Sequence, residues 1–140
     1  MSNFTINKKY HFYAGHRNEN LKDKCANLHG HTYYVDIYFT FPYDKKLGIT
    51  KLFSEIDDVV DPFIKKLDHS LLINKNDPLL KYLELFVVQE KTSLKLTKFN
   101  KVTSAEHLAE YIYNGLKELP ITKIVLQETK SSIVIYEPNS

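Results

Sequence analysis

The stretch of sequence that decides the fold runs from His31 to Phe41 and reads HTYYVDIYFTF. Its odd-numbered positions are mostly apolar or aromatic, whereas its even-numbered positions carry threonine, tyrosine and aspartate. This period of two predicts a β-strand with one buried face. The same alternation runs from Phe4 to Ala14 with a single interruption. If the polar residues 17–28 form a returning loop, the two strands pair in antiparallel fashion.

Two later segments predict helices. Apolar residues recur at three- and four-residue steps from Leu52 to Leu67, which indicates an amphipathic helix. Pro62 lies inside this pattern, so we expect a kink or two short helices. A second helix is expected over residues 105–119, with Ser104 as its N-cap.

The remaining segments predict strands. The residues from Phe86 to Phe99 are rich in β-favouring side chains and suggest a hairpin, and two closing strands are expected at Ile121–Thr129 and Ile133–Tyr136. This order predicts an α+β fold in which helices cover one face of an antiparallel sheet. Such a sheet has open edges, which a short chain can close by forming a homo-oligomer.

Composition excludes several classes of protein. The chain has 140 residues, which is room for a single domain over residues 1–140, and 43% of them are hydrophobic, so global disorder is excluded. A net charge of +2 gives no support for nucleic-acid binding, and four glycines leave no glycine-rich phosphate loop. One cysteine and the lack of a long apolar run predict a cytoplasmic protein with no membrane span.

The residues from Cys25 to His31 read CANLHGH and form the densest group of possible metal ligands. His29 and His31 are two apart, so on a strand both imidazoles point the same way. His16 closes the first predicted strand and lies near this pair if the two strands are partners. Three protein ligands with an open fourth position are typical of catalytic zinc. The alternative is that these histidines are separate and face solvent.

Cys25 has three interpretations. It could be a fourth zinc ligand, which would close the site and make it structural. It could be a free thiolate that acts as a base or nucleophile beside the metal. It could also be a small buried apolar residue, which is the commonest role of a free cysteine.

Several acidic and polar residues are further candidates. Asp68 and His69 follow the first predicted helix, where they suit either catalysis or helix capping. Glu128 shares parity with inward-facing apolar residues, so it needs a cation or several N–H donors as partner. Glu106 lies in the first turn after Ser104, where it either serves a pocket or simply complements the helix dipole.

Five blocks in this order resemble the 6-pyruvoyltetrahydropterin synthase / 6-carboxytetrahydropterin synthase family: FYAGH, CANLHGH, LDHSLLIN, TSAEHLAEYI and VLQET. The resemblance covers the chain from about Phe12 to Tyr136. It implies roles for residues that match the family's motifs. The implied zinc ligands are His16, His29 and His31; the catalytic residues are Cys25, Asp68 and His69; and the pterin-binding residues are Glu128, Glu106 and Ser104.

The resemblance also implies a fold and a reaction. The fold is the tunnelling fold, a four-stranded antiparallel sheet with two helices on one face, here with an extra hairpin. Subunits of this fold form trimers or dimers of trimers, with active sites between neighbouring subunits. The implied substrate is 7,8-dihydroneopterin triphosphate, and the cofactor is Zn²⁺. The expected product is 6-carboxy-5,6,7,8-tetrahydropterin of the queuosine-type 7-deazaguanine pathway.

Two alternatives stay open. The first is the pyruvoyl product of tetrahydrobiopterin synthesis, with release of triphosphate. The second is a non-catalytic zinc or pterin-binding module. Departures from the family pattern also stand out: Leu52 replaces a frequent aspartate, Thr103 replaces the usual proline, and residues 76–101 are longer than in short members.

Overall fold

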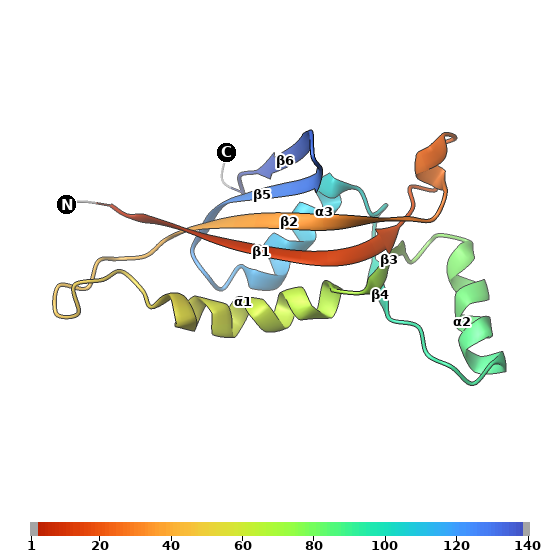
Figure 1. Cartoon of the computed structure of the whole chain (residues 1–140), viewed down its shortest axis with the longest axis horizontal. Helices are drawn as coiled ribbons and strands as arrows, with labels where there is room; N and C mark the ends of the chain where they lie inside the picture. Colours follow the sequence, from red (N-terminus) through yellow and green to blue (C-terminus); the bar gives the residue numbers. More distant parts are fainter. Residues whose placement is uncertain (1–2, 139–140) are drawn as a thin grey trace.

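The computed structural model describes residues 3–138, and within them six strands form one sheet (Figure 1). The strands are β1 (Thr5–His16), β2 (His29–Thr40), β3 (Ser70–Asn74), β4 (Leu96–Phe99), β5 (Ile121–Thr129) and β6 (Ser132–Tyr136). The helices are α1 (Phe53–Leu67), α2 (Leu79–Gln89) and α3 (Ala105–Leu116), with a short 3-10 turn, η1, at Lys24–Ala26.

The sheet contains the expected antiparallel strands but is larger than predicted. Its strand order is β4-β3-β1-β2-β5-β6, and the neighbours β1-β2, β2-β5 and β5-β6 are antiparallel. On the other side of β1, β3 runs parallel to β1 and β4 runs parallel to β3. The expectation of a four-stranded sheet is therefore wrong, because the segment after α1 adds two parallel strands to it.

The hairpin expected between Phe86 and Phe99 is also wrong. The first part of this segment belongs to α2, and the second part forms β4, which pairs with β3 rather than with a hairpin partner. The carboxylate of Asp77 accepts a hydrogen bond from the N–H of Leu79 at 2.9 Å, which caps the first turn of α2. The sequence pair Asp77-Pro78 is thus a helix start as well as a turn signal.

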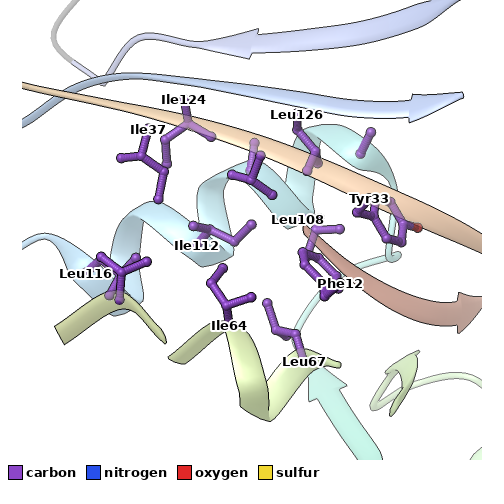
Figure 2. Packing of buried hydrophobic residues seen from close by; sticks show 14 of the residues in the cluster. Phe12, Tyr33, Ile37, Ile64, Leu67, Leu108, Ile112, Leu116, Ile124 and Leu126 are labelled. Atoms are coloured by element: carbon purple, nitrogen blue, oxygen red, sulfur yellow. The ribbon is translucent and has the colours of Figure 1, made fainter. Parts of the chain in front are cut away.

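Helices α1 and α3 cover one face of the sheet and enclose the core (Figure 2). The inward residues of β1 and β2, such as Phe12 and Tyr33, pack against Ile64 of α1 and Leu108 of α3. This side of the sheet is the one on which the alternating pattern placed the apolar residues. Of the two outcomes expected at Pro62, a kink or two short helices, the second is wrong, since α1 continues through Pro62, which is exposed.

The outer parts of the molecule expose apolar side chains. The described part of α2 has one buried residue, Leu80, and α2 stands apart from the other helices at the end of the sheet where β1 ends (Figure 1). Exposed apolar residues of α2 are Tyr82, Leu85, Phe86 and Val88, and those of β6 are Ile133 and Ile135. None of the helices between residues 3 and 138 is long and apolar enough to cross a membrane.

Candidate metal and pterin site

Strand register brings three histidines together. In the β1–β2 ladder His16 lies opposite His29, and Ala14 lies opposite His31. All three imidazoles therefore project from the helix-covered face at the same end of the two strands. One ligand nitrogen from each ring lies within 4.8 Å of the others. The predicted convergence of His16, His29 and His31 is confirmed.

Backbone carbonyls hold two of these rings in a fixed orientation. Nδ1 of His16 donates to the carbonyl of Thr103 at 2.7 Å, and Nδ1 of His29 donates to the carbonyl of Asn27 at 2.7 Å. A proton on Nδ1 leaves the Nε2 lone pair free to bind a cation. The main chain thus supplies the hydrogen bonds that would hold the His16 and His29 rings in place if they bound a metal ion.

The donor set fits a zinc ion. Nε2 of His16 is buried and has no hydrogen-bond partner among residues 3–138, which is costly unless a cation or donor meets it. Burial lowers the pKa of both His16 and His31, which favours the neutral imidazoles that bind metals. Three neutral imidazoles whose ligand nitrogens lie within 4.8 Å of one another could hold a metal ion, and nitrogen ligands of this kind suit zinc.

Glu128 of β5 lies beside the same cluster. Its Oε1 is 3.5 Å from Nε2 of His16 and 3.5 Å from Nε2 of His31. The Glu128 side chain is about one-quarter exposed, so it faces both the histidines and the adjoining space. A carboxylate in this position can accept N–H donors from a ligand bound next to the metal.

A cavity of about 740 Å³ adjoins the cluster. Its lining joins the three histidines to four other candidates from the sequence, namely Cys25, Ser104, Glu106 and Glu128. Apolar side chains from the loop before β2 and from β6 complete it, namely Leu21, Leu28 and Val134. A concave space that combines apolar side chains with several convergent polar groups is typical of a small-molecule site.

Cys25 borders this cavity, outside the group of converging ligand atoms. That group consists, over the described part of the chain, of the three histidines alone. The N–H of Cys25 donates to Asp23 at 2.8 Å, which anchors the 3-10 turn that carries the thiol. Partial burial and the charge of Asp23 raise the pKa of the Cys25 thiol.

Ser104 and Glu106 combine a structural and a cavity position. The hydroxyl of Ser104 accepts a hydrogen bond from the N–H of His107 at 3.3 Å, so the predicted N-cap of α3 is confirmed. Glu106 lies in the first turn of α3. Both residues line the cavity, so the N-terminus of α3 points its partial positive charge towards that space.

Asp68 and His69 are hydrogen-bonded to each other but do not line the cavity of Cys25. Oδ2 of Asp68 accepts from Nδ1 of His69 at 2.8 Å, while its Oδ1 accepts from the N–H of Tyr13 at 2.9 Å. The Tyr13 hydrogen bond, and then His69, lower the pKa of Asp68. His69 has a positive φ of 58°, a conformation that is uncommon for residues other than glycine.

This pair is not part of the cavity that holds Cys25. His69 borders a shallower cleft, together with His31 and Gly30. His31 thus lies between the cavity of Cys25 and the cleft of His69. A single chain brings Cys25 and Glu128 to the three histidines, but it leaves the side chain of His69 exposed and outside that cavity.

Four residues that support the site were not predicted. Thr103 holds His16, the ion pair between Arg17 and Asp77 lies behind the loop of Cys25, and Tyr33 lies next to His31 with ring centroids 5.5 Å apart. The Tyr33 hydroxyl is buried without a hydrogen-bond partner in the described structure, and burial raises its pKa. Of these residues, Arg17 could have been noticed in the sequence, since it is the only arginine and directly follows His16.

Comparison with known proteins identifies the family. The family model described as 6-pyruvoyl tetrahydropterin synthase matches residues 5–139. The chain is 30% identical to 6-carboxy-5,6,7,8-tetrahydropterin synthase of Aquifex aeolicus, over 94% of this chain and 96% of the relative. It is 28% identical to the protein of the same name from Haemophilus influenzae, over 96% of this chain and 99% of the relative.

A solved structure shows the same fold. The 6-pyruvoyl tetrahydropterin synthase of Caenorhabditis elegans matches with a TM-score of 0.70 at 24% identity, over 99% of this chain and 98% of that one. Fold, motif order and sequence similarity therefore agree over nearly the whole chain. The chain belongs to the 6-pyruvoyl tetrahydropterin synthase family.

Proposed function

We propose that the chain is a zinc-dependent lyase that converts 7,8-dihydroneopterin triphosphate to 6-carboxy-5,6,7,8-tetrahydropterin. The observation that carries this proposal is the convergence of three imidazoles beside a cavity that also contains Cys25 and Glu128. The product follows the names of the relatives from Aquifex aeolicus and Haemophilus influenzae. We accordingly assign the chain to 7-deazaguanine synthesis of the queuosine type in the cytoplasm.

The side chains at the cavity have complementary tasks in this reaction. His16, His29 and His31 would hold the metal, and zinc supplies a Lewis acid that lowers the pKa of hydroxyl groups it contacts. Glu128 accepts hydrogen bonds from the N–H groups of the pterin ring and so orients the substrate. Ser104 and Glu106 border the same end of the cavity.

Cys25 and His69 are the proposed proton carriers. The thiolate of Cys25 takes a proton from the substrate side chain, and His69 handles a second proton. Asp68 accepts from Nδ1 of His69, which leaves Nε2 of that ring to exchange the proton. The electrons left behind reduce the dihydropterin ring internally, so no nicotinamide or flavin is required. Triphosphate leaves, the bond between the first and second side-chain carbons breaks to release a two-carbon aldehyde, and one water molecule supplies the second carboxylate oxygen.

A homo-oligomer would bring the two parts of this site together. Since His69 does not reach the cavity of Cys25 within one chain, we propose that a neighbouring copy supplies Asp68 and His69. The exposed apolar residues of α2 and β6 and the open edges of the sheet support assembly into a trimer or a dimer of trimers.

Mixed oligomers test this sharing. Co-expression of Cys25→Ala and His69→Ala chains with different tags gives mixed oligomers in which some sites contain both functional residues. Activity regained in the mixture, and absent from each variant alone, supports a shared site. A mixture that stays inactive although it contains both chains contradicts it.

Mass analysis of the reaction products tests the function itself. The carboxy product keeps one of the three side-chain carbons, so a two-carbon fragment must leave together with triphosphate. The pyruvoyl product keeps all three carbons, and its appearance would establish the alternative activity. A chain that binds zinc and pterin but releases nothing would be the non-catalytic binding module instead.

A further inference from the structure

Arg17 follows the metal-site residue His16 directly and is the only arginine in the chain. Its guanidinium forms a two-pronged ion pair with Asp77, in which Nε donates to Oδ2 at 2.8 Å and Nη2 donates to Oδ1 at 2.6 Å. Asp77 is only 3% exposed. A planar guanidinium can make this parallel pair of hydrogen bonds, whereas the ammonium group of lysine cannot.

The same guanidinium reaches the loop that carries Cys25. Its Nη1 donates to the carbonyl of Ala26 at 3.4 Å. The two neighbouring carbonyls are also held, because that of Cys25 accepts from the N–H of Asn18 at 2.8 Å and that of Asn27 accepts from Nδ1 of His29 at 2.7 Å. Hydrogen bonds to three consecutive carbonyl groups, those of Cys25, Ala26 and Asn27, therefore fix the path of the loop beside the three histidines.

The other end of this connection is the start of α2. Asp77 caps the first turn of α2 through the N–H of Leu79, at 2.9 Å. Just before it, Asn74 at the end of β3 donates to Glu19 at 2.9 Å. The segment that leads into α2 thus holds the loop of Cys25 at two points, and both points lie far from the loop in sequence.

We propose that the Arg17–Asp77 ion pair positions the thiol of Cys25 relative to the three-histidine site. Neither residue is among those that line the cavity, so the pair acts through the loop and not on the substrate. For its effect on turnover, the inference rests on the proposed function.

Alkylation of the only cysteine measures loop position without any substrate. Full-length Arg17→Lys and Asp77→Asn proteins, shown by circular dichroism to be folded, are treated with iodoacetamide in zinc-loaded and metal-free form. We expect the alkylation rate constant of Cys25 to rise about threefold or more in both variants, because the loop opens more often. If either variant fails to fold, Asp77→Glu takes its place, since it keeps the charge and shifts the carboxylate.

The matched control removes another ion pair of α2. Glu84 on α2 accepts from Nζ of Lys98 on β4 at 3.0 Å, and both side chains are about half exposed. Glu84→Gln should leave the alkylation rate of Cys25 unchanged, because this pair does not contact the loop. Rates within measurement error of wild type in every folded Arg17 and Asp77 variant would overturn the proposal, as would an equal rise in Glu84→Gln.

Turnover of 7,8-dihydroneopterin triphosphate gives the second readout. We expect kcat to fall about tenfold or more in Arg17→Lys while KM and zinc content stay near wild type, because only the thiol is displaced. Loss of zinc instead would show that the pair serves the metal and would overturn the positioning role. If wild type turns over no dihydropterin, the proposed function fails, and the alkylation rates still decide the positioning role.

Discussion

The carbonyl of Thr103 accepts a hydrogen bond from Nδ1 of His16 at 2.7 Å, although 87 residues separate the two in sequence. Thr103 lies just before α3, and its hydroxyl also donates to the carbonyl of Arg17 at 3.3 Å. One residue thus connects the metal-site end of β1 to the start of α3.

Thr103→Val removes the hydroxyl, which lies 3.3 Å from Nδ1 of His16 and 3.3 Å from the carbonyl of Arg17, and keeps the main-chain carbonyl that holds His16 at 2.7 Å. Valine has nearly the same shape, but it leaves the half-buried carbonyl of Arg17 without its hydroxyl donor. We expect the free energy of unfolding to fall by about 1 kcal/mol in denaturant titrations. Zinc affinity should change less than about threefold, because the main-chain carbonyl that holds His16 remains. A much larger loss of zinc would mean that the hydroxyl orients His16.

Glu128→Gln tests the proposed anchor of the pterin ring. Glutamine has the same size but no charge, so the charge-assisted hydrogen bonds to ring N–H groups are lost. We expect the affinity for a dihydropterin, followed by fluorescence titration, to fall about tenfold to a hundredfold. Zinc content should stay at the wild-type value. Because Oε1 lies near two of the imidazoles, a loss of zinc would instead identify Glu128 as a metal ligand.

Asp23→Asn changes the reactivity of Cys25. Partial burial and the Asp23 carboxylate raise the pKa of the thiol, and asparagine removes the charge but keeps an acceptor for the Cys25 N–H. The midpoint of the alkylation rate against pH should therefore move to lower pH, so the variant reacts faster at neutral pH. Asp58→Asn, a change at an exposed residue of α1, is the control. An unchanged or higher midpoint in Asp23→Asn would contradict the electrostatic explanation.

The ion pair of Asp77 predicts how stability depends on pH. Arg17 lowers the pKa of Asp77 in the folded state, whereas an unfolded aspartate has a pKa of about 3.9. The stabilisation is fully present above that value and is lost as the pH falls through the lower folded pKa. We expect Asp77→Asn to cost about 3 kcal/mol at pH 7, because it leaves Arg17 without its partner.

Urea unfolding of both proteins at pH 7 and pH 3 measures this effect. The difference in unfolding free energy between wild type and Asp77→Asn should shrink at pH 3, because an unfolded aspartate takes up a proton there while the lowered pKa of Asp77 opposes protonation in the folded state. A difference of the same size at both pH values would show that packing, and not the charge of Asp77, stabilises this region.

The long strands could be predicted from the sequence because their alternation extends over many residues. The pairing of β1 with β2 then followed, and with it the approach of His16 to His29. β3 escaped prediction because it is short and buried on both faces, so the run Leu71-Leu72-Ile73 shows no alternation. In α2, the β-favouring residues Phe86, Val87 and Val88 outweighed the helix start at Asp77.

The candidate site divides in the same way. Motif and spacing were enough to predict the convergence of the three histidines, and they also named Cys25 and Glu128, which the fold places at the same cavity. The contacts of Arg17 with Asp77 and of Thr103 with His16 join residues 60 and 87 positions apart. No local pattern encodes such contacts, because they depend on how β3 pairs within the sheet and how α3 packs against it.

Zinc content of four proteins tests the central claim most directly, namely that three imidazoles hold the metal while the thiol stays unligated. Wild type and Cys25→Ala should each bind one zinc per chain, measured by atomic absorption after removal of loosely bound metal. His29→Ala should lose the zinc, and His11→Ala, a change on the exposed face of β1, should keep it. Loss of zinc in Cys25→Ala, or its retention in His29→Ala, would contradict the claim.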